Sequence, residues 1–287
     1  MAVADEAWHL NVLDVPALAA RGLTGRGVTI GVVDTGVVAA HPDLAGARVR
    51  TLDVRGTAFD GVDLNGHGTA MIGLLAGRAT GVAPDASIVS VKALVAGAAA
   101  DLDALVTGIE IALDQGIDVL SLSVGSPDVD TALSQIIQRA VSRGVLVVAA
   151  GDDANGTTPL YPAALTPVVS VTASNREGAC LFELLPAWLD VAAPGVVLPT
   201  LALVGETTVT GTSPATAACA GVCALLLGIA PQARRRALAR HMLGILASTG
   251  ISPTGATGPN TPKLLAPSAA AAAVDAWLVQ PPPPEAP

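Results

Sequence analysis

Short runs of β-branched and other apolar residues recur along this chain, and they constrain its fold more than any other feature. A half-buried strand alternates apolar and polar residues, whereas a parallel strand covered by helices on both faces reads as a continuous apolar run. The runs therefore predict buried parallel strands. They occupy residues 28–33, 87–94, 117–123, 145–150 and 168–172.

Amphipathic helical segments separate several of these strands. Residues 101–115 and 130–143 place apolar residues at helical spacing, and each segment is followed or ended by a glycine, Gly116 or Gly144. Asp130 can cap the start of the second segment. Strands that alternate with helices predict an α/β protein with a parallel sheet and right-handed crossovers.

Length and composition exclude several classes of protein. The chain has 287 residues, 51% of them hydrophobic, so it can bury a large core and is too apolar for intrinsic disorder. Its formal net charge of −9 argues against a nucleic-acid partner. Residues 207–233 carry no charge, but their apolar part, residues 217–230, is shorter than the roughly 20 residues of a membrane-spanning helix. We therefore expect a buried helix there and no membrane span.

The sequence also gives expectations for compartment and boundaries. The first residues are acidic and lack the apolar stretch of a signal peptide, and the 3 cysteines do not make a disulfide framework. We expect a cytoplasmic protein, or an extracellular one if the chain is a trimmed mature form. Cys219 and Cys223 fall on one face of the apolar helix and are expected to be buried thiols. The expected organisation is an N-terminal extension over residues 1–7, one domain over residues 8–273 and a proline-rich tail over residues 274–287.

Polar residues beside the predicted strands and helices are the candidates for a site, because open α/β sheets bind ligands at the carboxyl ends of their strands. Asp34 directly follows the first apolar run; alone, it could cap a turn or bind a ribose or a metal. His67 lies between two glycines at a helix start. A lone histidine is more often structural, and His9 and His41 have only that interpretation. Ser213 precedes the apolar helix, where alone it could serve as an N-cap.

Together, Asp34, His67 and Ser213 follow one another in the order known for subtilisin, and the segments around them resemble the subtilisin-like serine proteases, or subtilases. The resemblance runs through roughly residues 8–273. The segments that carry it are DTGV, HPDL, NGHGTAMIGLLAG, GVAPDASIVSVKAL, GIDVLSLSVG, GVLVVAAGD, YPAALTPVVSV, LDVAAPG and GTSPATAACAGVCALLL.

The resemblance implies a doubly wound α/β fold, with a mostly parallel sheet and helices on both faces in a single domain, and serine endopeptidase activity. Ser213 would be the nucleophile, His67 the general base, and Asp34 the group that orients and stabilises the imidazole. The Ser213 N–H would be one donor of the oxyanion hole. Substrate would bind along Ser121, Leu122, Ser123, Val124 and Gly125 and against a wall formed by Ala149, Ala150 and Gly151.

One position departs from the family pattern. Where subtilases place an asparagine whose amide donates to the oxyanion, this chain has Asp152. An ionised carboxylate donates no hydrogen bond and repels negative charge. A protonated Asp152 could still donate, or Asn155 could take over; the alternative is an impaired subtilase-fold protein that binds peptides or a partner. We expect an active but slowed enzyme that works better at mildly acidic pH.

Further differences concern metal and specificity. Residues 77–80 contain no carboxylate where many relatives insert a calcium-binding loop, so Asp43 would lack co-ligands, and we expect no metal or other cofactor. Leu160 stands where relatives often have a small residue at the floor of the specificity pocket, and it predicts a shallow pocket for small or medium apolar side chains. No glycine-rich loop follows a strand, which argues against a nucleotide-binding protein. We expect a monomeric bacterial endopeptidase that acts on peptide or protein substrates.

Overall fold

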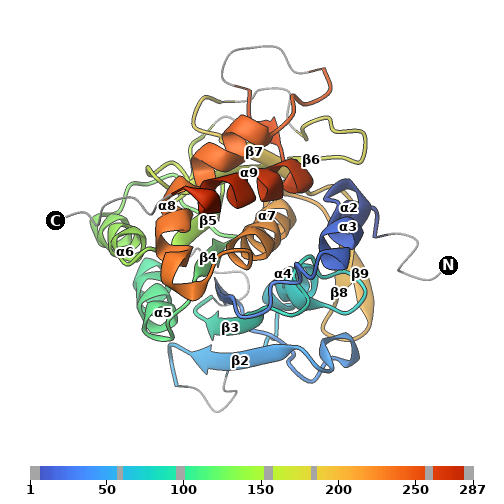
Figure 1. Ribbon diagram of the computed structural model, residues 1–287. Coiled ribbons are helices and arrows are strands. Elements are labelled where there is room, and N and C mark those ends of the chain that lie inside the picture. Colours follow the sequence, from blue (N-terminus) through green and yellow to red (C-terminus); the bar gives the residue numbers. More distant parts are fainter. Residues whose placement is uncertain are drawn as a thin grey trace.

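The computed structural model of the protein describes residues 7–56, 61–94, 101–151, 158–181, 186–255 and 261–280. Its centre is an 8-stranded sheet in which all neighbouring strands are parallel, in the order β10-β7-β6-β5-β4-β1-β3-β2 (Figure 1). The strands are β1 (Thr29–Asp34), β2 (Arg48–Asp53), β3 (Ser87–Lys92), β4 (Val119–Leu122), β5 (Leu146–Ala150), β6 (Val169–Ser174), β7 (Val191–Pro194) and β10 (Lys263–Leu264).

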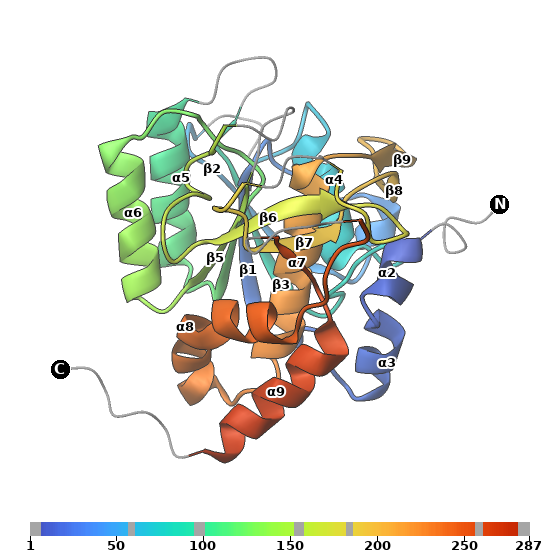
Figure 2. The same ribbon diagram turned by 90° about the horizontal axis from the view of Figure 1, so that it is seen from above.

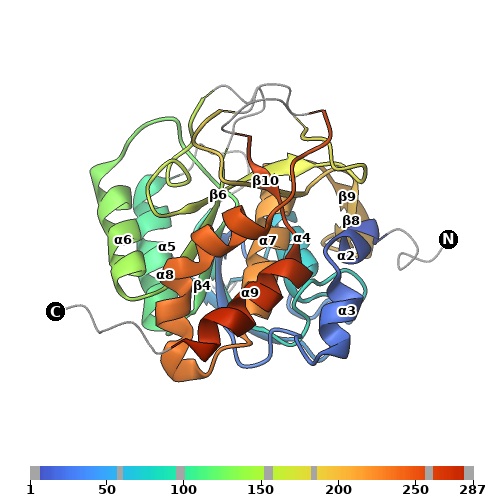
Figure 3. The same cartoon turned by 45° about the horizontal axis from the view of Figure 1, so that its top comes forward.

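Helices cover both faces of this sheet. In Figure 2, α5 and α6 lie on one side of the sheet and α4 and α7 on the other, while Figure 3 shows α8 and α9 packed together over α7. An antiparallel hairpin of β8 and β9 packs against α4. The bounds are α2 (Trp8–Val12), α3 (Val15–Ala20), η1 (Pro42–Leu44), α4 (His67–Ala76), α5 (Leu102–Asp114), α6 (Thr131–Ser142), β8 (Leu198–Leu201), β9 (Glu206–Val209), α7 (Thr212–Leu227), α8 (Gln232–Thr249) and α9 (Pro267–Val279).

The two faces of the sheet explain why its strands are apolar at successive positions. Val32 belongs to the core cluster under α4 and α7, whereas its neighbour Val33 belongs to the cluster under α5 and α6. The same division holds for Val148 and Val147 in β5. Since successive side chains of a strand point to opposite faces, both sets must be apolar when both faces are covered. The predicted doubly wound α/β fold is confirmed.

The predicted elements correspond to observed ones with small shifts at their ends. The five apolar runs become β1, β3, β4, β5 and β6, and the two amphipathic segments become α5 and α6. Asp101 and Asp130 cap α5 and α6 by accepting hydrogen bonds from the backbone N–H groups of Ala104 and Leu133. Helix α9 continues through residue 273, where we expected the domain to end.

The uncharged segment contains the buried helix α7, which packs against five strands of the sheet and against α4, α8 and α9. Cys219 and Cys223 are buried in it, and a hydrogen bond between the two thiols, together with burial, raises the pKa of Cys219 well above its usual range. These cysteines are therefore core residues rather than nucleophiles. Within the described ranges, none of the helices has the length and apolar character needed to cross a lipid bilayer.

The strand order of the sheet reverses between β1 and β4. The chain passes from β1 through β2 to β3 on one side and then crosses to β4, which pairs with β1 on its other side. Open α/β sheets bind ligands in the crevice beyond the carboxyl ends of the strands at such a switch point. Asp34 ends β1, and Ser123 directly follows β4.

Candidate active site

Asp34 is buried at the carboxyl end of β1, with a residue exposure of 1%. The N–H of Thr35 donates to its Oδ1 at 2.7 Å. The chain then turns through Gly36, whose φ of +103° suits glycine, and a Cβ there would lie 2.3 Å from the carbonyl oxygen of Gly61. The turn thus holds a carboxylate inside the protein and leaves room for another segment beside it.

His67 is the first residue of α4 and follows Gly66, which has a φ of +103°. Gly68 lies against the turn after β1: a Cβ on Gly68 would lie 2.2 Å from the carbonyl oxygen of Gly36. The absence of a side chain at Gly68 therefore allows the two backbones to approach closely. This contact fixes the start of α4 against the end of β1.

The imidazole of His67 faces the carboxylate of Asp34. Nδ1 of His67 lies 2.8 Å from Oδ1 and 2.9 Å from Oδ2 of Asp34. Because a carboxylate accepts hydrogen bonds, it favours the tautomer in which Nδ1 carries the proton. The lone pair of the neutral ring is then on Nε2. The His67 side chain is 34% exposed, so this nitrogen is available to a reactant.

The surroundings of His67 also change its proton affinity. Burial of the ring acts to lower the pKa of His67, but the hydrogen bond with Asp34 and the negative charges of Asp34 and Asp63 outweigh it, so the pKa is raised above the usual 6.5. A raised pKa makes His67 a stronger base, and the neutral ring that can act as a base predominates only above that pKa.

Asp63 is a functional residue that the sequence analysis missed. Its side chain is buried and accepts hydrogen bonds from the backbone N–H groups of Asn65, Gly66 and Thr69 and from the Thr69 hydroxyl, at 2.7–3.0 Å. It therefore shapes the loop that enters α4 and holds His67 in place. The sequence feature that could have indicated this role is an aspartate four residues before the histidine.

Side chains satisfy the N–H groups of the first turn of α4. Asn65 Oδ1 accepts from the His67 N–H, Thr35 Oγ1 from the Gly68 N–H and Asp63 from the Thr69 N–H. Such groups lack partners within the helix itself. The N–H groups at the N-terminus of α4 are thus already bonded, and they position the histidine.

Ser213 lies in the first turn of α7, at the same edge of the sheet. The N-cap of this helix is Gly211, so Ser213 is its second residue rather than its cap. The Ser213 N–H has no acceptor within the ranges that the structure describes. The Ser213 hydroxyl donates to the carbonyl oxygen of Ser123 at 3.1 Å, and the Ser123 hydroxyl donates back to the Ser213 carbonyl at 3.0 Å. This end of α7 is open and can receive an anion.

Fewer residues of the predicted substrate-binding segment are available to a substrate than we expected. Ser121 and Leu122 are buried in β4, which pairs with β1 on one side and β5 on the other, so their backbone cannot pair with a substrate. Ser123 is occupied by its mutual hydrogen bonds with Ser213. The residues that extend beyond the sheet are Val124 and Gly125.

Leu160, which we expect at the floor of the specificity pocket, lies beside Gly125. A Cβ on Gly125 would lie 2.8 Å from Cβ of Leu160. Ser126 and Tyr161 hold the two segments together through paired backbone hydrogen bonds of 3.0 and 2.8 Å. A leucine therefore fills space that a smaller residue would leave open.

The predicted wall at the end of β5 is only partly available. Ala149 and Ala150 are buried within β5, and Gly151 follows it with its N–H bonded to the Val171 carbonyl. The Trp188 indole N–H donates to the Gly151 carbonyl at 2.9 Å and fixes this end of the strand. Asp152 and Asn155, the residues predicted for the oxyanion hole and its substitute, lie outside the described residues.

A groove opens on another side of His67. It has a volume of about 540 Å³ and lies between the start of α4 and the β8–β9 hairpin. Its lining is mostly apolar and includes Ala70, Leu201, Leu203 and Val209. Apolar side chains of a bound chain would find complementary surface here.

His9, His41 and Asp43 have structural partners. His9 is buried next to the carbonyl of Thr80, and Nε2 of His41 lies 2.9 Å from the carbonyl of Gly205, which agrees with their structural interpretation. Asp43 accepts from the Ala79 N–H at 3.3 Å and lies 3.6 Å from the Arg78 guanidinium. Across the described ranges, His, Cys, Asp and Glu side chains form no group of three or more suited to a metal ion.

Comparison with known proteins matches residues 25–255 to the subtilase family. M-protease of Shouchella clausii (strain KSM-K16) is 37% identical over 232 residues, which are 76% of this chain and 59% of that protein. Subtilisin DY of Bacillus licheniformis is 37% identical over 236 residues, 78% of this chain and 85% of that protein. The solved structure of a cold-adapted subtilisin-like serine proteinase is similar with a TM-score of 0.74 at 30% identity, covering 84% of this chain and 89% of that one.

Replacing the carboxylate beside the histidine tests the geometry directly. We expect Asp34→Asn to lower the pKa of His67, because the negative charge is lost and a neutral amide stabilises the imidazolium less, while burial of the ring still lowers the pKa. Asp63→Asn should lower it less, since Asp63 raises the pKa of the ring only through its charge and makes no hydrogen bond to it. NMR titration of the histidine rings measures both effects. Asp103→Asn on α5 is the control, and an unchanged pKa in Asp34→Asn would show that the contact is not formed in solution.

Proposed function

The chain belongs to the subtilase family, a family of serine endopeptidases, and we propose that it hydrolyses peptide bonds with Ser213, His67 and Asp34. The observation that carries this proposal is the buried Asp34 carboxylate, 2.8 Å from Nδ1 of a half-buried His67, at the sheet edge that also holds the open end of α7. A protein that only binds peptides has no need for a buried, correctly oriented acid–base pair.

The proposed reaction begins when the Ser213 hydroxyl turns from the Ser123 carbonyl to Nε2 of His67. Its proton moves to Nε2 as Oγ bonds to the scissile carbonyl carbon, whose oxygen becomes an oxyanion held by the Ser213 N–H. Asp34 stabilises the imidazolium through Nδ1. The C–N bond then breaks and the amine leaves with the proton from Nε2. Water repeats the sequence on the acyl-enzyme and releases the acid.

We propose that Asp152 occupies the second donor position of the oxyanion hole and donates only when it is protonated. The support is the resemblance of residues 145–152 to the family segment that ends in an asparagine at this place. The rate then depends on the protonation states of two groups, His67 and Asp152. Activity falls at low pH as His67 becomes protonated, and at higher pH as Asp152 ionises, so the pH profile is bell-shaped.

We propose that the substrate is a peptide or protein that pairs in an extended form with Val124 and Gly125. Main-chain pairing of this kind tolerates many sequences, while side-chain pockets select among them. The contact between Leu160 and Gly125 makes the primary pocket shallow, which favours small or medium apolar side chains. The apolar groove beside His67 receives a further part of the chain.

Labelling with a fluorophosphonate, followed by mass spectrometry of the tryptic peptides, tests the proposed triad. The probe reacts with activated serines, so we expect modification at Ser213 alone. His67→Ala should abolish it because the proton acceptor is lost, whereas His241→Ala, which changes an exposed histidine of α8, should leave it intact. A folded protein that is not labelled at pH 5.5 or 7.5 would favour the alternative, an impaired subtilase fold that binds peptides.

Asp152→Asn tests the oxyanion proposal separately. In subtilisin, one oxyanion donor contributes about 10²–10³ in kcat. We therefore expect the variant to be faster than the parent at pH 7.5, by up to about 10², and to lose the alkaline limb of the profile while keeping the acid limb of His67. Asp153→Asn is the matched control at the neighbouring residue. An unchanged rate and pH profile in Asp152→Asn would show that Asp152 has no part in the reaction.

Leu160→Gly tests the proposed pocket floor. Removal of the side chain should open space beside Gly125, so kcat/KM for peptides with a large apolar side chain before the scissile bond should rise relative to those with alanine. One methylene group in such a pocket changes discrimination by about 10-fold or more, so a leucine should change it by at least that factor. Leu181→Gly, at an exposed leucine, is the control. Equal preferences in Leu160→Gly and the parent would place the pocket elsewhere.

A further inference from the structure

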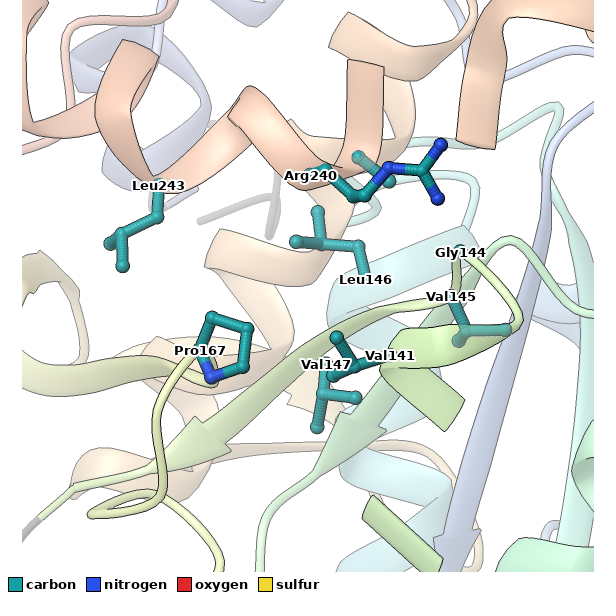
Figure 4. Close-up of a pocket in the computed structure, with 9 residues that line it drawn as sticks. Val141, Gly144, Val145, Leu146, Val147, Pro167, Arg240 and Leu243 are labelled. Carbon is teal, nitrogen blue, oxygen red and sulfur yellow. The ribbon is translucent and has the colours of Figure 1, made fainter. Parts of the chain in front are cut away.

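A second cavity lies at the opposite end of the sheet from His67. It has a volume of about 280 Å³ and opens between α8, the end of α6 and the beginning of β5. Figure 4 shows Leu243 and Arg240 projecting from α8 on one side and Val141, Val147 and Pro167 facing them on the other. Since β5 runs from Leu146 at this cavity to Ala150 near the candidate active site, the two sites are separated by the length of a strand.

The cavity follows from how α8 meets the end of α6. Gly144 ends the α6 segment with a φ of +76°, and a Cβ there would lie 2.6 Å from Cβ of Arg236, so α8 approaches closely at this point. One and two turns further on, α8 presents Ala239 and Leu243 to the sheet. The small side chain of Ala239 leaves a space that is bounded by Val141, Leu146 and Pro167.

Arg240 gives this apolar cavity a positive rim. Its side chain is exposed and has no hydrogen bond or ion pair with any described residue, and the cavity lining contains no aspartate or glutamate. Two neighbouring arginines are paired: Arg143 lies 3.4 Å from Asp114, and Arg235 lies 3.9 Å from Asp118. Arg236, whose Cβ approaches Gly144, adds a second exposed positive charge at this end of α8. The guanidinium of Arg240 beside this apolar surface complements an anion.

We propose that this cavity binds a small aliphatic monocarboxylate. The aliphatic chain lies between Leu243 and Pro167, where the walls are apolar, and the carboxylate meets the guanidinium of Arg240 at the other end of the cavity. Arginine presents N–H groups in a planar fork that matches a carboxylate. The cavity is close to the lower limit of about 300 Å³ for small-molecule sites, which restricts the ligand to a short chain.

Octanoate is the probe for this proposal, and calorimetry or ligand-detected NMR measures its dissociation constant. We expect Arg240→Gln to weaken binding about fivefold, as for an ion pair at a partly exposed position. Arg50→Gln, an exposed charge change on β2, should leave binding unchanged. Because Arg240 has no partner among the described residues, its replacement removes no contact that the fold needs there.

Three further measurements separate the proposal from its alternatives. Octan-1-ol should bind more weakly than octanoate; equal binding would show that the charge is not recognised. Octanoate should bind equally well after Ser213 has been blocked with fluorophosphonate, and loss of binding would assign the ligand to the groove beside His67. Truncation after Gln280 should leave the affinity unchanged. Binding that appears only after truncation would make the chain's own last residues the occupant and overturn the proposal.

Discussion

The buried carboxylate of Asp34 is the constraint on which the geometry of the site depends. An isolated charge inside a protein is costly unless it is hydrogen-bonded or paired. Here the Thr35 N–H and the His67 imidazole supply those partners. The imidazole can reach Asp34 only because α4 begins beside the turn after β1, and Gly36 and Gly68 allow that approach. One buried charge thus couples the end of a strand, a tight turn and the start of a helix.

The two helices that meet at this edge use their N-termini in opposite ways. In α4, Asn65, Thr35 and Asp63 satisfy the first N–H groups, so the helix end serves only to fix His67. In α7, the Ser213 N–H is left without an acceptor in the described structure. The partial positive charge of a helix N-terminus is therefore directed at the position where an oxyanion would form. The proton acceptor is held rigidly while the anion site stays open.

Much of this arrangement could be predicted from the sequence, because it follows from local patterns. Continuous apolar runs predicted the buried strands, and the chain order of Asp34, His67 and Ser213 indicated the site. Asp63 was missed because its role depends on hydrogen bonds between a loop and the start of α4, and a hydrophobic pattern does not predict such bonds. The register of β4 was also hidden, so Ser121 and Leu122 were assigned to the substrate although Ser121 pairs with both neighbouring strands and Leu122 with β5. The strand β9 was not predicted, because it is mostly exposed and its sequence contains no apolar run.

The departure at Asp152 lies outside the contacts that hold His67, so the effect that we propose for it is electrostatic. The contacts that orient His67 come from Asp34, and the loop around it is held by Asp63, neither of which depends on the residue after Gly151. In the proposed oxyanion hole, the carboxyl group of Asp152 would experience two opposing influences. The helix N-terminus favours its ionised form, whereas an oxyanion beside it favours the protonated form. Under this proposal, protonation of Asp152 and formation of the oxyanion would be coupled, so the transition state would raise the proton affinity of the site. The pH range of activity would then be set by the pKa of Asp152 beside the oxyanion and by the pKa of His67.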